Sequence, residues 1–253
     1  MNREEQWLLE EKYHGEKSTG FFTDCQRLQN GEPLAYIIGS VPFLDCTIFL
    51  DSHPLIPRPE TEFWVEKALQ NIKGAMLEEP RILDLCAGSG CIGIAVAKAI
   101  PTAVITFGEI DPNHVPTIQK NIANLDIMHD MKIRNQIIQS DLFEHINDTY
   151  DFILSNPPYI NASLKRVEKS VINYEPHDAL FAKHDGLEII EKIIAQTQTH
   201  LNLNGILYLE HEPEQVTTIH TLAKQNNLNA VTHNDQYNVP RYTTFTRTPP
   251  DRA

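Results

Sequence analysis

The sequence predicts an α/β fold: a mostly parallel sheet with an antiparallel C-terminal edge, preceded by a short N-terminal helical segment. From residue 81 onward, short apolar strands alternate with helices, which is typical of a parallel sheet with helices on both faces. Two β-like runs, residues 229–233 and 242–247, follow the last helix and are short enough to form an antiparallel edge pair. Apolar residues before Gly39 recur at near-helical spacing.

The first 59 residues divide into two predicted parts. Residues 1–39 form a helical segment, which Gly15 and Gly20 interrupt and which is too small to bury a core of its own. Residues 40–59 form a strand-and-turn linker, in which 41–50 is rich in Phe, Ile and Thr and the following prolines make a stiff turn. The main domain is predicted to span residues 60–253.

The main domain is predicted to begin with a helix through about residue 72 and then to alternate. Strands are predicted over residues 81–85, 103–109, 131–139, 150–155 and 205–210. Helices are predicted over residues 91–100, 112–125, 187–201 and 214–225. Asp111 and Pro112 favour the start of the second of these helices, since aspartate caps a helix and proline suits its first position. Residues 161–183 are predicted to form a loop.

The composition indicates a globular protein and argues against several kinds of partner. Hydrophobic residues make up 41% and charged residues 22% of the 253 residues, so a packed core is expected. The net charge of -13 would repel a phosphate backbone, which favours a protein or small-molecule partner over a stable nucleic-acid complex. No apolar run approaches the ~20 residues that span a bilayer, and the first residues lack the apolar core of a signal peptide. We therefore expect a cytoplasmic protein without membrane contact. Separately, we expect it to act as a monomer.

The four cysteines give no sign of a metal site. Cys25, Cys46, Cys86 and Cys91 form no CxxC pair and have no neighbouring histidine cluster. The pattern therefore favours reduced, packed thiols over a zinc site or a disulfide framework, and no metal is predicted.

A glycine-containing loop follows the first strand of the alternating region. Residues 84–90, Asp-Leu-Cys-Ala-Gly-Ser-Gly, stand at the carboxyl end of that strand, where open α/β sheets bind ligands. A tight turn without a ligand explains such a loop about as well. Glu109 ends the next strand and can accept hydrogen bonds from both ribose hydroxyls of a nucleoside. Asp141 and Leu142, after the third strand, can contact the amino group and the ring of an adenine.

A nicotinamide cofactor is the competing interpretation of this loop. Gly88, Gly90 and Gly93 satisfy the dinucleotide spacing GxGxxG, so the glycines alone leave it open. Nothing basic lies near the loop to assist in binding a pyrophosphate. Glu109 and Asp141 together look more like a clamp for a nucleoside.

The strongest signal is Asn156-Pro157-Pro158-Tyr159 at the end of the fourth strand. Prolines have no N–H group, so nearby carbonyls remain available as acceptors. The N–H groups of a planar amide can donate to the side-chain oxygen of Asn156 and to the carbonyl of Pro157, which orients a weakly nucleophilic nitrogen. Tyr159 is expected to wall the pocket and to pack on the flat amide. A plain proline turn with a surface tyrosine is the less favoured alternative.

The motif resembles that of the class I, Rossmann-like methyltransferases with an NPPY sequence, and four further motifs narrow the resemblance. Residues 55–62, Leu-Ile-Pro-Arg-Pro-Glu-Thr-Glu, look like the signature of the HemK/PrmC protein-glutamine methyltransferases. Residues 31–39 are similar to that family, as are Tyr-Glu-Pro at 174–176 and Asp-Gly-Leu at 185–187. The resemblance covers nearly the whole chain.

The resemblance implies S-adenosylmethionine as the cofactor and the glutamine in the GGQ motif of peptide-chain release factors as the substrate. The residues then expected to contact the cofactor are Asp84, Cys86, Ala87, Gly88, Ser89, Gly90, Glu109, Asp141, Leu142 and Asn156. The catalytic residues are expected to be Asn156, Pro157 and Tyr159, and Pro158 and Arg58 are expected to join them in binding the substrate.

Three features depart from the family pattern. Glu109 stands where aspartate is usual, and its longer carboxylate can still reach a ribose. Cys86 replaces the first glycine of the commoner loop, which indicates a backbone contact rather than thiol chemistry. The helical segment 1–39 is shorter than the family's usual N-terminal domain, which leaves the docking surface for a release factor open.

Three other functions stay open at the level of sequence. The same acceptors suit an exocyclic amine of a DNA or RNA base, although the net acidity and the 55–62 signature argue against it. A glutamine of a ribosomal protein is a second alternative substrate. A cofactor-binding module without catalysis is the third, and the intact NPPY motif disfavours it.

Arg58 is predicted to shape a lid beside the reacting site, together with Glu60 and Thr61. Prolines on both sides of Arg58 make a rigid entry to the following helix. A surface arginine in a capped turn fits the same pattern about as well.

Overall fold

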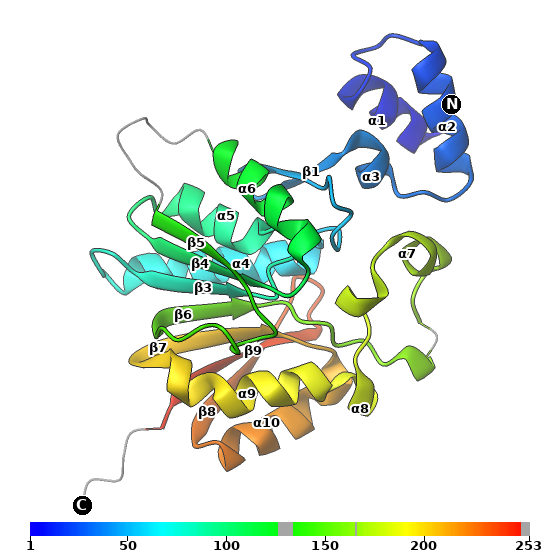
Figure 1. The fold of residues 1–253 in the computed structure, drawn as a ribbon. Coiled ribbons are helices and arrows are strands. Elements are labelled where there is room, and N and C mark those ends of the chain that lie inside the picture. The colour runs from blue at the N-terminus through cyan, green and yellow to red at the C-terminus, as the bar shows by residue number, and fades with distance from the viewer. Residues whose placement is uncertain (126–133, 165, 249–253) are drawn as a thin grey trace, which may run out of the picture.

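The computed structural model describes residues 1–125, 134–164 and 166–248, and its centre is a seven-stranded sheet with the order β5-β4-β3-β6-β7-β9-β8 (Figure 1). Its strands are β3 (Arg81–Leu85), β4 (Val104–Glu109), β5 (Arg134–Gln139), β6 (Tyr150–Ser155), β7 (Leu201–Glu210), β8 (Leu228–Asn234) and β9 (Pro240–Arg247). The strands from β5 to β7 pair in parallel, and β9 pairs antiparallel with both β7 and β8. The predicted fold class, with its antiparallel C-terminal edge, is confirmed.

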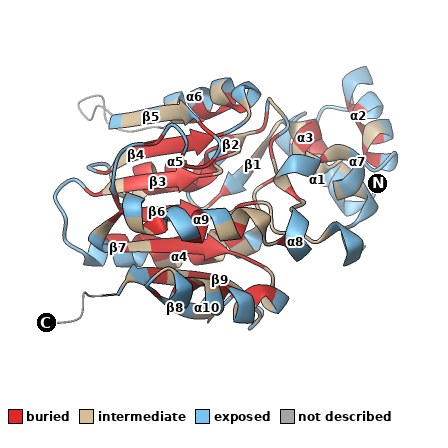
Figure 2. Cartoon of the chain, turned by 60° about the horizontal axis from the view of Figure 1, so that its bottom comes forward, coloured by how far each residue is buried: buried red, intermediate tan, exposed pale blue. Residues whose placement is uncertain are grey.

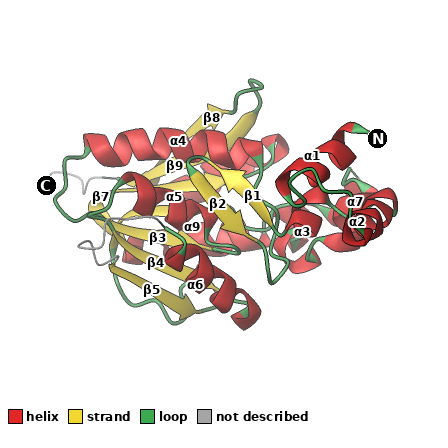
Figure 3. Ribbon diagram, turned by 90° about the horizontal axis from the view of Figure 1, so that it is seen from above, coloured by secondary structure: helices red, strands yellow, loops and turns green. Residues whose placement is uncertain are grey.

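Helices cover both faces of this sheet (Figure 3). One face carries α4 (Pro59–Gly74), α5 (Cys91–Ala99) and α6 (Val115–Ala123), and the other carries α9 (Glu188–His200) and α10 (Val216–Gln225). Side chains alternate between the faces along each strand, so Ile82 and Tyr208 join the first core while Leu83 and Leu207 join the second. Figure 2 shows that burial is concentrated in the central strands. No helix in the described part of the chain is long and apolar enough to cross a membrane.

The N-terminal unit consists of α1 (Arg3–Glu11), α2 (Thr19–Gln29) and α3 (Leu34–Ile38), which lie apart from the sheet (Figure 1). The prediction that this part cannot bury a core is wrong. Leu8, Phe21 and Ile37, one from each helix, are at most 3% exposed and belong to a separate apolar cluster. The side chains of Asn2 and Ser18 cap α1 and α2, which fixes two short helices whose apolar sides can meet.

The strand-like character predicted for residues 41–50 is confirmed, but it belongs to two strands. The structure has a hairpin here, in which β1 (Ser40–Phe43) pairs antiparallel with β2 (Cys46–Phe49). Leu44 takes a left-handed conformation with φ of 49° in the two-residue turn, and its N–H donates to the carboxylate of Glu62. The turn is held by a contact from α4 rather than by a glycine or asparagine, so the sequence carries no ordinary turn signal.

The predicted loop over residues 161–183 contains α7 (Lys169–Tyr174) and is followed by α8 (Lys183–Gly186). Figure 1 shows α7 beside the N-terminal unit and off one side of the sheet, and the hydroxyl of Tyr174 donates to the carbonyl of Asn30 at 3.3 Å. Of two further strand boundaries, one differs by four residues and one cannot be compared. β7 begins at Leu201 rather than at residue 205, and the predicted start of the third strand at residue 131 lies outside the described residues.

The order of strands reverses between β3 and β6. From β3 the chain builds outward through β4 and β5, and then it crosses to β6 on the other side of β3. In the register, Leu85 is opposite Gly108 of β4 and Ser155 of β6, so these strands end at one level. Open α/β sheets bind ligands in the crevice at such a point.

Candidate active site

The loop that follows β3, residues 86–90, is called here the cofactor loop. Cys86, Gly88 and Gly90 have positive φ values of 62°, 55° and 78°. A side chain at Gly88 would meet nothing closer than the Cβ atom of Pro54 at 4.0 Å, so the backbone is open to the approach of a ligand. Burial raises the pKa of the Cys86 thiol, which is consistent with a contact through its backbone rather than through a thiolate.

Asp84 supports this loop from inside the protein. It is fully buried, and its Oδ2 accepts a hydrogen bond from the N–H of Gly93 at 2.8 Å in the first turn of α5. Its Oδ1 has no partner among the described residues, and burial raises its pKa to about 8. Because the carboxylate points to α5, its direct contact with a cofactor stays a prediction.

Glu109 lies beside the cofactor loop at the end of β4. Its Oε2 accepts from the N–H of Gly88 at 2.6 Å and its Oε1 from the N–H of Asp111 at 2.9 Å. A carboxylate has about four lone-pair sites, so acceptor capacity remains for two hydroxyl groups. The backbone N–H of Ser140 donates to the carbonyl of Glu109 at 2.8 Å, which brings the loop after β5 to the same place.

The remaining predicted cofactor residues lie in or next to these loops. Asp141 is exposed, while Leu142 is buried with a left-handed φ of 50°. An open glycine backbone with carboxylates at the ends of β4 and β5 fits a nucleoside, so the residues present fit the adenosyl part of S-adenosylmethionine. The described His, Cys, Asp and Glu side chains form no group of three that could hold a metal ion.

The segment from Asn156 to Tyr159, called here the NPPY turn, follows β6 next to the cofactor loop. The hydroxyl of Ser155 donates to the carbonyl of Leu85 at 2.8 Å and fixes the two strand ends to each other. The Nδ2 of Asn156 donates to the hydroxyl oxygen of Thr61 at 3.1 Å. Within the described part of the chain, no hydrogen bond is made to the Oδ1 of Asn156 or to the carbonyl of Pro157. These neighbouring oxygens are the acceptors that the sequence predicts.

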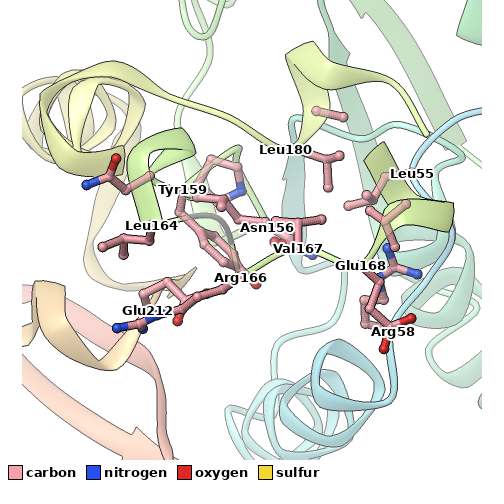
Figure 4. A pocket seen from close by; sticks show the side chains of 15 residues that line it. Leu55, Arg58, Asn156, Tyr159, Leu164, Arg166, Val167, Glu168, Leu180 and Glu212 are labelled. Carbon is pink, nitrogen blue, oxygen red and sulfur yellow. The ribbon is translucent and has the colours of Figure 1, made fainter. Parts of the chain in front are cut away.

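A cavity of about 420 Å³ opens at the NPPY turn, and Asn156, Pro157 and Tyr159 line it. Figure 4 shows that its wall combines apolar and charged side chains, among them Leu55, Arg58, Leu164, Arg166, Leu180 and Glu212. The cofactor loop does not contribute to this lining. Asn156 therefore stands between the two halves of the site, with the cofactor loop beside its strand and the cavity at its side chain.

Arg58 lies at the cavity and is paired with a residue that the sequence reasoning did not connect to it. Its Nη2 lies 2.6 Å from Oε1 of Glu175, whose side chain is only 1% exposed. The other oxygen of Glu175 accepts from the N–H of Ile56 at 3.0 Å. The pair joins residues 55–59 to the 161–183 segment, which is more than a free surface arginine does. A role as a lid remains a prediction, and the Tyr-Glu-Pro motif was the available signal for Glu175.

Glu210, at the end of β7, is the main residue that the sequence reasoning missed. It is 1% exposed and accepts from Thr61 at 2.7 Å, from the indole of Trp64 at 2.6 Å and from the hydroxyl of Tyr159 at 2.8 Å. Thr61 is therefore a buried residue, 1% exposed, and its part in a lid stays a prediction. The signal was the alternation along β7, which places Glu210 on the same face as Tyr208, against α4.

Tyr159 lines the cavity and is held by hydrogen bonds at its hydroxyl group and at its backbone carbonyl. Burial raises the pKa of its hydroxyl well above the usual value, and the nearby carboxylate of Glu210 raises it further. Its backbone carbonyl accepts from Nε2 of Gln215 at 2.9 Å. Gly186 packs against the same carbonyl with φ of 86°, and any side chain there would collide with it. This contact explains the glycine of the Asp-Gly-Leu motif.

Comparisons with known proteins agree with this site. Residues 65–175 match the family model of the methyltransferase small domain. The release factor glutamine methyltransferase of Rhodopirellula baltica is 35% identical over 216 residues, which cover 83% of this chain and 72% of that protein. The one from Flavobacterium psychrophilum is 36% identical over 215 residues, covering 83% of this chain and 74% of that protein.

A likeness to solved structures supports the fold alone. The hMettl16 catalytic domain, solved in complex with a MAT2A 3'UTR hairpin, has a TM-score of 0.62 to this chain at 18% identity. The match covers 81% of this chain and 77% of that one.

Proposed function

Since this chain belongs to the release factor glutamine methyltransferases, we propose that it methylates the side-chain amide nitrogen of the glutamine in the GGQ motif of peptide-chain release factors. The chain is a methyltransferase, and S-adenosylmethionine is its methyl donor. The observation that carries the proposal is the pair of unpaired acceptors, Oδ1 of Asn156 and the carbonyl of Pro157, next to a cavity at the reversal of the sheet.

The cofactor loop and its neighbours are proposed to hold the methyl donor. The open backbone at Gly88 lets the ligand approach, Glu109 accepts from the ribose, and Asp141 with Leu142 receives the adenine. Asp84 holds the loop in place, and Cys86, Ala87, Ser89 and Gly90 contribute backbone contacts. The bound cofactor supplies an electrophilic methyl group on a sulfonium.

The NPPY turn is proposed to orient the glutamine. An amide nitrogen is a poor nucleophile because its lone pair is delocalised into the carbonyl. When its two N–H groups donate to Asn156 and to Pro157, the nitrogen is held in one orientation and the positive charge that develops on it is stabilised. No strong base is needed before attack, since the proton leaves afterward. Most of the acceleration then comes from alignment and electrostatic fit.

Tyr159 and Arg58 complete the half of the site formed by the NPPY turn and its cavity, called here the acceptor side. The ring of Tyr159 forms a wall against which the flat amide packs, and its hydroxyl is fixed to Glu210, so the wall cannot swing away. Pro158 keeps the turn rigid. Arg58, fixed by Glu175, holds the edge of the cavity where the rest of the release factor enters.

The context of the reaction follows from this substrate. A release factor is a partner in translation, so we propose a cytoplasmic monomer that forms no stable complex with nucleic acid, in keeping with its net charge of -13.

The test is to incubate the protein with methyl-labelled cofactor and a purified release factor, and to locate the label by mass spectrometry. We expect the label on the GGQ glutamine, and none on a factor in which that glutamine is replaced. Labelling of a ribosomal protein or of RNA in a parallel extract, with the factor unlabelled, would transfer the assignment to one of the alternative substrates.

A further inference from the structure

We propose that Glu210 and Thr61 are positioning residues that set the polarity of the Asn156 side chain, so that its oxygen and not its nitrogen faces the substrate. The two ends of a carboxamide have nearly the same shape, yet only the oxygen can accept a hydrogen bond from the substrate amide. The inference rests on the proposed function for the identity of that substrate. It concerns Thr61, Asn156 and Glu210, which are far apart in the sequence and come together only in the folded chain.

The first step concerns which groups donate hydrogen bonds to the carboxylate of Glu210. An ionised carboxylate only accepts, and an indole N–H only donates. Glu210 is 1% exposed, and its Oε2 is contacted by both Trp64 Nε1 at 2.6 Å and Thr61 Oγ1 at 2.7 Å, while Oε1 accepts from Tyr159 at 2.8 Å. Burial raises the pKa of Glu210, and the three donors and the nearby cation of Arg241 lower it only in part. The geometry has the hydroxyl of Thr61 donating to Oε2 at 2.7 Å, on the oxygen that also accepts from Trp64. The single hydroxyl proton of Thr61 is therefore directed to Glu210.

The second step follows from the chemistry of a hydroxyl group. With its proton directed to Glu210, Thr61 can offer Asn156 only lone pairs. At 3.1 Å the Asn156 atom that faces Thr61 must then be a donor, which is Nδ2. The reversed carboxamide would place two acceptor oxygens against each other in a partly buried setting and leave the Asn156 amide without this partner. Oδ1 consequently points away from Thr61 and toward the proposed position of the substrate N–H groups.

The hydrogen bonds that link Glu210 through Thr61 to Asn156, called here the relay, join residues that are far apart in the sequence. Thr61 lies in the first turn of α4, and Glu210 ends β7, so the relay is fixed to two rigid elements on the first face of the sheet. The stacking of Trp64 on Tyr208, with ring centroids 6.2 Å apart, holds α4 against β7. A positioning group on rigid elements defines an orientation more closely than one on a loop.

The decisive variants change the polarity with little change in shape. Thr61→Val removes the hydroxyl, and Thr61→Ser keeps it. Glu210→Gln supplies an amide that can donate to Thr61, so that the threonine proton can turn toward Asn156. We expect Thr61→Val and Glu210→Gln to lower kcat roughly 10- to 100-fold, with KM for the release factor and Kd for S-adenosylmethionine changed far less. Thr61→Ser should retain most of kcat.

Thr197→Val is the matched control for the loss of a buried hydroxyl. Thr197 is fully buried, and its hydroxyl donates to the carbonyl of Ile193 within α9, away from the site. Its kcat should equal that of the wild type. If Thr61→Val lowers kcat no more than Thr197→Val does, the relay is refuted.

An NMR measurement tests the orientation without any methyl transfer. In protein labelled with ¹⁵N-asparagine, the side-chain NH₂ signal of Asn156 is assigned by its loss in Asn156→Ala. We expect a nuclear Overhauser contact from these protons to the γ-methyl of Thr61, and its loss or a second set of signals in Glu210→Gln. Absence of the contact in the wild type would overturn the relay. This measurement needs no substrate, so a wrong substrate assignment would not affect it. The wild-type contact tests the orientation even if Glu210→Gln does not fold.

Discussion

The two halves of the active site are built in different ways. The hydrogen bonds that shape the cofactor loop join residues close in the chain, with separations of 9 for Asp84 and Gly93 and 21 for Gly88 and Glu109. The acceptor side is held by hydrogen bonds between residues far apart in the chain. Their separations in residues are 95 for Asn156 and Thr61, 117 for Arg58 and Glu175, and 149 for Thr61 and Glu210.

The donors differ as well. On the cofactor side, backbone N–H groups donate to the carboxylates of Asp84 and Glu109, so main-chain geometry contributes to the shape of the loop. On the acceptor side, the hydrogen bonds of Asn156, Arg58 and Glu210 named above run from side chain to side chain, so the site depends on the packing of α4, β7 and the 161–183 segment. Changes on the acceptor side should therefore alter turnover, whereas changes on the cofactor side should alter cofactor affinity and local stability.

The largest effect is expected for Asn156→Ala. It removes one of two acceptors and leaves a substrate N–H unpaired in the cavity. Loss of one such preorganised group lowers kcat by about 10²–10³-fold in comparable sites. Steady-state kinetics with a release factor and calorimetry with S-adenosylmethionine should show a much smaller change in Kd than in kcat.

Asn156→Asp sharpens the same test. It keeps an acceptor of similar shape but adds a negative charge beside a cationic cofactor, which favours the ground state as much as the transition state. We expect cofactor binding to be as tight as in the wild type or tighter, with kcat still low. A wild-type kcat in either variant would contradict the role of Asn156 as an orienting acceptor.

The next largest effect is expected for Arg58→Ala. The buried carboxylate of Glu175 would keep only the N–H of Ile56, and loss of a hydrogen bond to a charged group costs about 1.5–3 kcal/mol. The free energy of unfolding, measured with urea, should fall by that amount, and kcat/KM should fall because the cavity wall loses its support.

Arg166→Ala is the control for a cavity-wall arginine. Arg166 is 60% exposed and pairs with the exposed carboxylate of Glu214, so its loss should change stability far less than the loss of Arg58 does. If Arg58→Ala leaves stability, turnover and cofactor affinity all unchanged, Arg58 is an ordinary surface residue and the lid prediction fails.

A smaller effect on the cofactor side is expected in the pH dependence of stability. The pKa of Asp84 is raised to about 8 in the folded chain, against about 3.9 in an unfolded one. Between these values the folded state holds a proton that the unfolded state has lost, so stability falls as pH rises and levels off above about pH 8. Asp84→Asn should flatten the decrease of Tm between pH 5 and 8, a window that lies within this range.

Asp45→Asn, at an exposed carboxyl in the turn between β1 and β2, is the matched control and should leave the slope of Tm against pH unchanged. An equal slope in the wild type and in Asp84→Asn would mean that Asp84 is ionised in the folded protein at neutral pH.

The smallest effect is expected for Gly88→Ala. An L-residue at its φ of 55° is strained by about 1–2 kcal/mol, although there is space for the methyl group. The free energy of unfolding should fall by about 1 kcal/mol, and the Kd for S-adenosylmethionine should rise. Gly74→Ala, at the end of α4 with no positive φ, should be neutral or stabilising. If Gly88→Ala lowered kcat without raising the Kd for S-adenosylmethionine, Gly88 would act on the acceptor side of the site rather than on the cofactor side.

The errors in the sequence analysis occur where long-range contacts decide local structure. The turn at Leu44 is held by Glu62 of α4, and the helix α7 sits in a segment fixed by the pairing of Glu175 with Arg58. Neither contact has a local pattern. The N-terminal unit buries a core because three short helices meet there, and composition alone does not reveal that meeting.

The sequence by itself determined the α/β class, the antiparallel edge, the family and the position of both loops at the strand ends. These follow from the period of the apolar residues and from contiguous motifs, in which neighbouring residues carry the geometry with them. Only the tertiary structure decided that Thr61, Glu175 and Glu210 support Asn156 and Arg58. Their side chains act through burial and hydrogen bonding with distant partners, and such contacts exist only once the sheet has brought those partners together.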